Sequence, residues 1–234
     1  MVAPRARNRR FRLSLESRKS AALQDPGAEL VDQLTGLWNQ YGRIALGVVG
    51  ALIVIGVVAF YTVSQGARQN LEAAKKLNDA DILYWRGDYP QALTAAQDVA
   101  KNWGSTPSGI DAHRLAGDCA FWQGKFKDAI TEYRAYLAKR GSGLLAQGVQ
   151  RSLAYALDSD RQYAAASKQY LALVGVFDRE SSAEMLTGSA RCELLAQNRA
   201  AAIRDLRRVV DEYSETSYAT RARLQLAELG AAPS

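Results

Sequence analysis

The chain has 234 residues, of which 48% are hydrophobic and 23% are charged, with a formal net charge of +6. This composition is typical of a folded protein and excludes an intrinsically disordered chain. Two cysteines and a single histidine exclude a disulfide framework and any multi-cysteine or multi-histidine metal site.

The sequence also lacks the motifs of the common catalytic sites. It contains no glycine-rich nucleotide loop, no HExxH zinc motif and no GxSxG nucleophile motif. We therefore expect no catalytic residue, no cofactor site and no metal site, and we expect that the protein is not an enzyme.

The first predicted segment is a basic tail over residues 1–27. Its first 19 residues hold seven Lys and Arg against one Glu, without a periodic apolar pattern. We interpret it as a disordered cytoplasmic tail that sets membrane topology, with binding to anionic lipid or ribosomal RNA as the alternative role. Residues 64–234 hold 22 basic and 20 acidic residues, so we expect no nucleic-acid binding there.

Residues 28–43 predict a short amphipathic helix at the inner membrane surface. Apolar side chains recur at helical spacing, and two aromatic residues near its end suit an interfacial belt. The residues of the apolar face are Leu30, Leu34, Leu37 and Tyr41, with Val31 and Trp38 beside them.

Residues 44–63 predict a transmembrane helix. The stretch from Ile44 to Val63 carries no charge, and twenty helical residues reach about 30 Å, which is the thickness of a hydrocarbon core. The basic tail predicts a cytoplasmic N-terminus and an exported C-terminal part. A cleaved signal peptide is the alternative to an anchor. Gly47 and Ala51 form a small-xxx-small pair that is a candidate for helix packing, although such pairs are common in spans.

Beyond the span, one phrase recurs. The stretch YWRGDYPQA begins at Tyr84 and FWQGKFKDA begins at Phe121, 37 residues later. Weaker forms follow at RQYAAASKQY from Arg161 and QNRAAAIRDL from Gln197. A fixed period in this range predicts a solenoid of stacked repeats, because each unit needs its neighbours to bury its apolar face.

Each repeat unit predicts two helices. In the second unit the first helix is AHRLAGDCAFW, the second is FKDAITEYRAYL, and Gly124 marks the turn between them. Ala129, Tyr133 and Tyr136 share one face of the second helix. We expect residues 64–234 to form an all-α solenoid of about four hairpins, ending in a capping helix from Tyr218.

The repeats resemble the tetratricopeptide repeat. That pattern has a small residue late in the first helix, Gly near the turn, an aromatic residue two positions on and Ala three further. The matching residues are Ala80, Gly87, Tyr89 and Ala92; Gly117, Gly124, Phe126, Ala129 and Tyr133; Leu153, Ala154, Tyr163, Ala166 and Tyr170; and, weakly, Ala190, Ala202, Leu206 and Val209. The period of 36–37 departs from the family's 34, which implies longer turns between hairpins.

The whole layout is similar to bacterial single-span tetratricopeptide proteins that accompany the Sec translocon, of the YfgM type. That resemblance implies an inner-membrane protein with a cytoplasmic N-terminus and a periplasmic repeat domain. It further implies a scaffold that links translocon subunits to a periplasmic chaperone or newly exported proteins. The alternative is an envelope-assembly or cell-division scaffold that binds other periplasmic or outer-membrane machinery.

Four aromatic residues are the candidate partner-binding residues. Tyr84 and Trp85 occupy the same repeat positions as Phe121 and Trp122, and Trp and Tyr dominate binding hot spots. The alternative is packing between hairpins. Small buried thiols are the expected state of Cys119 and Cys192, which fall two repeats apart. His113 is expected to be a partly exposed surface residue.

Overall fold

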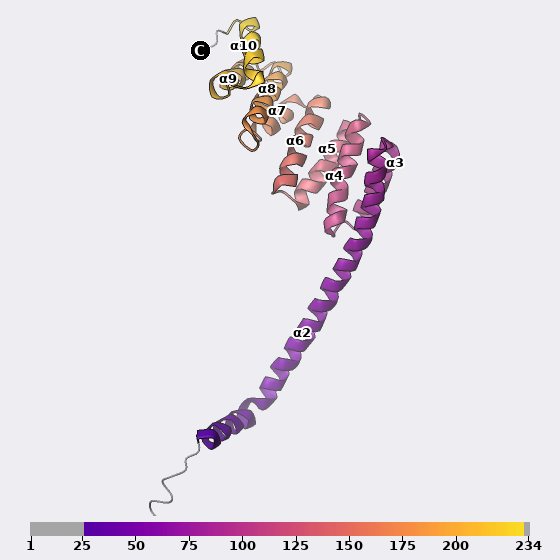
Figure 1. The fold of residues 1–234 in the computed structure, drawn as a ribbon, viewed down its shortest axis with the longest axis vertical. Helices are drawn as coiled ribbons and strands as arrows, with labels where there is room; N and C mark the ends of the chain where they lie inside the picture. Colours follow the sequence, from indigo (N-terminus) through magenta and orange to yellow (C-terminus); the bar gives the residue numbers. More distant parts are fainter. Residues whose placement is uncertain (1–25, 232–234) are drawn as a thin grey trace, which may run out of the picture. The chain divides into compact units, whose positions relative to one another are not determined.

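The computed structural model describes residues 26–231, and Figure 1 shows that all the regular secondary structure in this range is helical. The predicted all-α fold is confirmed. The basic tail predicted over residues 1–27 lies outside the described residues except for its last two positions. The chain divides into two units, Met1–Val63 and Ser64–Ser234, which are described separately below.

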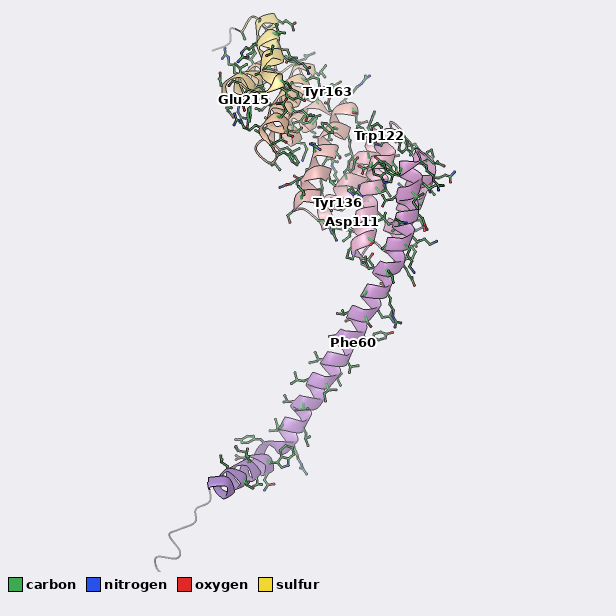
Figure 2. All side chains as sticks on the ribbon, viewed as in Figure 1. Phe60, Asp111, Trp122, Tyr136, Tyr163 and Glu215 are labelled. Carbon is green, nitrogen blue, oxygen red and sulfur yellow. The ribbon has the colours of Figure 1, made fainter. Side chains whose placement is uncertain are left out.

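Helix α2 runs from Pro26 to Trp85 without a break, through the predicted juxtamembrane helix and the predicted span. Its apolar side chains between residues 44 and 63 are exposed, and Phe60, labelled in Figure 2, is 76% exposed. By length and composition, α2 can cross a membrane, with a mean hydropathy of 2.7 in its most apolar window, none of which is buried. The last part of α2, beyond Val63, belongs to the second unit and forms the first helix of the first hairpin.

The second unit is an α-solenoid of four helical hairpins and a capping helix, as the repeat period predicts. Helices that follow each other in the chain pack side by side from α3 to α10. After α2, the described residues form α3 (Tyr89–Asn102), α4 (Pro107–Trp122), α5 (Phe126–Lys139), α6 (Leu144–Ser159), α7 (Tyr163–Leu171), α8 (Arg179–Leu195), α9 (Arg199–Glu212) and α10 (Ser217–Glu228). Hairpins 1 to 4 are therefore α2/α3, α4/α5, α6/α7 and α8/α9.

The turn inside each hairpin has the same backbone conformation in all four repeats. Its key residue has a positive φ: 81° at Gly87, 72° at Gly124, 62° at Arg161 and 63° at Gln197. In each turn this residue's N–H bonds the carbonyl three residues back, and the next N–H bonds the carbonyl five residues back. These bonds form a Schellman motif, which ends a helix by using the left-handed conformation that glycine adopts without strain.

Small residues on the first helices let the tyrosines of the second helices pack closely. A Cβ at Gly117 would lie 2.5 Å from the Tyr133 ring, and a Cβ at Gly188 would lie 3.2 Å from the Tyr170 ring. Both rings are almost fully buried, as is Tyr136. The prediction that Ala129, Tyr133 and Tyr136 share one face of α5 is confirmed, because all three are buried. The tyrosine rings fill the space that glycine leaves at the helix interface.

Candidate functional site

The candidate residues of the first two hairpins belong to one aromatic cluster, which we call the aromatic edge. It lies at the intra-hairpin turns, where α2 and α4 end and α3 and α5 begin. Trp122, at the end of α4, is labelled in Figure 2. The members of the aromatic edge are Tyr84, Trp85, Tyr89, Phe121, Trp122 and Phe126.

Tyr84 is the centre of the first half of the aromatic edge. Its ring meets Trp85 edge-on at 5.4 Å between centroids and Tyr89 at 5.5 Å. The Trp122 Nε1–H donates a hydrogen bond to the Tyr84 hydroxyl oxygen at 3.0 Å. Because Trp122 comes from the second hairpin, this bond joins the two repeats at their turns.

Further ring contacts continue the cluster into the second hairpin. Tyr89 stacks on Trp122 with centroids 6.2 Å apart and an angle of 16° between the planes. Phe121 meets Trp122 edge-on at 6.1 Å and Phe126 at 5.5 Å. Each such pair contributes roughly 0.5–1.5 kcal/mol beyond area burial, so the contacts hold the rings in fixed positions.

Burial separates the four predicted site residues into two kinds. Tyr84 and Phe121 are half-buried and pack against the main hydrophobic core. Trp85 is 82% exposed and Trp122 is 60% exposed. Burial also raises the pKa of the Tyr84 hydroxyl, whose oxygen accepts the hydrogen bond from the indole N–H. The tyrosine and phenylalanine thus support two tryptophans that face solvent.

Tyr89 and Phe126 join the site although sequence reasoning did not select them as candidates. Both lie two residues after the turn glycine, so the repeated phrase already contained them. The corresponding place in the third repeat is Tyr163, but Ser159 and Leu195 take the place of the tryptophans in the last two repeats. The aromatic edge is therefore limited to the first two hairpins.

A hollow with a volume of about 460 Å³ lies on the C-terminal repeats, on α6, α7, α8 and α10. The Tyr155 hydroxyl donates to Glu184 at 2.7 Å on its wall, and the Arg191 guanidinium bonds Asp158. The Arg221 guanidinium lies 5.9 Å from the ring centroid of Tyr218. This hollow is lined by both charged and aromatic side chains, and no pattern in the sequence indicated it.

The single histidine and the two cysteines are packed within the repeats. His113 is partly exposed, as expected, with 17% of its side chain exposed, and its Nδ1 lies 2.7 Å from Glu132 Oε2. Cys119 and Cys192 are fully buried, and burial raises the pKa of each thiol to about 12. In the part of the chain that the structure describes, no group of three His, Cys, Asp or Glu side chains converges on a metal position.

Gly47 and Ala51, the candidate helix-packing pair, lie on α2 and are exposed. A Cβ built at Gly47 would meet nothing within 4 Å. The pair remains a predicted contact surface for another membrane helix.

Comparison with known proteins shows what the repeats are similar to. The family model described as Tetratricopeptide repeat matches residues 77–143, which span most of the first two hairpins. Residues 77–143 are therefore similar to tetratricopeptide repeats. This stretch contains the whole aromatic edge, so the rings lie at the turns of the two hairpins that are similar to tetratricopeptide repeats. No curated protein matches the chain.

Solved structures give the same fold. A crystal structure of nearly identical TPR-like repeats of a putative kinesin light chain from Podosopora anserina matches at a TM-score of 0.50 and 16% identity, covering 62% of this chain and 76% of that one. A second crystal structure of those repeats matches at a TM-score of 0.53 and 16% identity, covering 67% and 87%. At this identity the likeness shows the fold alone.

Proposed function

We propose that this chain is a membrane-tethered scaffold that binds apolar segments of other proteins at the aromatic edge. Tetratricopeptide repeats indicate a protein-interaction scaffold, and the described residues hold no converging metal ligands. The observation that carries the proposal is the pair of exposed tryptophans, Trp85 and Trp122, which both contact Tyr84.

Two physical properties of the aromatic edge favour binding. Tryptophan side chains bury a large apolar area on contact and are the residues most enriched among interface hot spots. The indole of Trp122 is already fixed by its bond to Tyr84 and its stacking on Tyr89. A partner therefore pays little side-chain entropy to bind it, since the ring is ordered beforehand.

The tether is the apolar part of α2 over residues 44–63. Its length, hydropathy and exposure support a membrane span, and the basic tail before it supports a cytoplasmic N-terminus. We place the repeats on the far side of a bacterial inner membrane, in the periplasm. The layout supports Sec translocon subunits, a periplasmic chaperone or newly exported proteins as partners, with Gly47 and Ala51 as a contact for another membrane helix.

In-cell photo-crosslinking tests this function. One variant carries the photoreactive residue in place of Trp122, and a second carries it in place of Leu52 within the span. A matched control carries it in place of Leu144, which is 79% exposed but lies at the start of α6, away from the aromatic edge. Captured proteins are identified by mass spectrometry.

The proposal expects translocon subunits from position 52 and exported proteins or a chaperone from position 122, with neither from position 144. Outer-membrane or division proteins from position 122, without translocon subunits from position 52, would replace the translocon role with an envelope scaffold. Cytoplasmic proteins from position 122 would show that the topology is inverted. Equal capture from positions 122 and 144 would contradict a role for the aromatic edge.

A further inference from the structure

A buried polar seam joins hairpin 3 to hairpin 4. Ser167 of α7 and Ser189 of α8 are almost fully buried, and their hydroxyl oxygens lie 3.1 Å apart. The Ser189 hydroxyl is 2.6 Å from the Asp205 carboxylate of α9. The Ser167 hydroxyl is 2.5 Å from the Glu193 carboxylate of α8. The four groups form a chain, from Asp205 through two serines to Glu193, across three helices.

The number of protons that these four groups share determines how they hydrogen-bond to one another. It has three close oxygen–oxygen contacts, but two serine hydroxyls supply only two protons. If both carboxylates are ionised, each serine donates to its own carboxylate, and the two serine oxygens then face each other with no proton between them. One additional proton on Asp205 completes the series, because Asp205 then donates to Ser189, Ser189 to Ser167, and Ser167 to Glu193.

We propose that this seam is a pH-sensitive latch between hairpins 3 and 4, which is closed when Asp205 carries the extra proton and weakened when that proton leaves. The proton belongs on Asp205 because this carboxyl is 6% exposed, whereas Glu193 is only half-buried. Ionisation of Asp205 would place a second negative charge in a seam that already holds Glu193. Two like charges joined through two hydroxyls repel, and burial makes that repulsion stronger.

The groups around Asp205 act on its ionisation in both directions. Glu193 of α8 disfavours its ionisation, while the hydrogen bond from Ser189 of α8 and the charges of Arg204 and Arg208 of α9 favour it. Helix α7 contributes the Ser167 hydroxyl. Burial is the largest influence, and the pKa of Asp205 is raised above its ordinary value. A carboxyl with a raised folded-state pKa stabilises the fold fully below the unfolded-state pKa, near 4, and that stability is lost as pH rises through the folded-state pKa.

The test compares the full chain in detergent with its Asp205→Asn variant, which keeps the shape and has no proton to lose. Denaturant unfolding is followed from about pH 4 to about pH 9. We expect the stability of the variant to increase relative to that of the wild type as pH rises. The folding equilibrium should shift about tenfold for each unit by which the pKa of Asp205 is raised. Asp79→Asn, which alters an exposed carboxylate on α2, is the control and should show no such gain.

Infrared spectroscopy provides a second, direct measurement. The difference spectrum between the wild type and Asp205→Asn should contain the carbonyl stretch of a protonated carboxyl group above the pH where ordinary aspartates are ionised. Glu193→Gln should lower the pH at which this band disappears, because it removes the neighbouring charge. The latch is refuted if the band disappears at the ordinary aspartate pKa, or if Asp205→Asn and the wild type differ equally at all pH values.

Discussion

The left-handed turn residues allow a quantitative test of how the repeats are stabilised. Gly87 and Gly124 occupy the positive-φ position in hairpins 1 and 2, but Arg161 and Gln197 occupy it in hairpins 3 and 4. A non-glycine residue in this conformation costs about 1–2 kcal/mol. Glycine in turn lowers the free energy of unfolding by about 0.4–1 kcal/mol, because it gives the unfolded chain more conformational freedom. The net gain expected for Arg161→Gly is therefore about 1 kcal/mol in the free energy of unfolding.

Gly124→Ala should cost the same amount, since a Cβ at Gly124 would meet nothing within 4 Å and only the backbone conformation is affected. Urea unfolding of the full chain in detergent measures both changes, and 1 kcal/mol moves the midpoint by about 0.5 M at a slope of about 2 kcal/mol/M. Arg161→Ala is the matched control, because it removes the side chain and keeps the strain, and it should leave the midpoint unchanged. If Arg161→Gly is no more stable than Arg161→Ala, the strain at this turn is absent and the reasoning fails.

Two further predictions concern the interior. Gly117→Ala should destabilise the fold by about 1–3 kcal/mol, because the new methyl group would overlap the Tyr133 ring. Gly148→Ala in α6 has open space and should stabilise the fold by roughly 0.5–1 kcal/mol. Thermal or urea unfolding of both variants checks these opposite signs. Cys119 and Cys192 should resist a thiol reagent at neutral pH in the native chain and react after denaturation. A pKa of about 12 lowers the thiolate fraction about a thousandfold relative to an ordinary thiol. Rapid labelling of the native protein would contradict the burial of both thiols.

Much of the fold follows from the 37-residue period. The repeated phrase fixes the helix pairs, and the recurring Ala and Tyr positions fix the buried face of α5, which the structure confirms. The period even marks Arg161 and Gln197 as turn positions, because they align with the turn glycines. Their positive φ was beyond prediction from residue type, since arginine and glutamine rarely adopt it and the neighbouring helices impose it.

The site was less predictable than the fold. Spacing placed Trp85 and Trp122 at equivalent positions, but only the packed hairpins show that Trp122 bonds Tyr84 and remains exposed. The buried chain from Asp205 to Glu193 was not foreseen, because its members are common polar residues on three helices with no motif between them. Contacts of this kind depend on side-chain positions across repeats, which a period alone does not determine.

Partner recovery from membranes tests the central claim most directly. The full chain is purified in mild detergent as the wild type, as a Trp85→Ala/Trp122→Ala variant and as a Leu144→Ala/Leu224→Ala control, and bound proteins are quantified by mass spectrometry. The control removes two exposed apolar side chains outside the aromatic edge. We predict that the tryptophan variant loses bound partners at least tenfold while the control retains them, as expected when hot-spot residues are removed. Equal recovery by all three proteins would contradict the claim that this chain binds its partners through the aromatic edge.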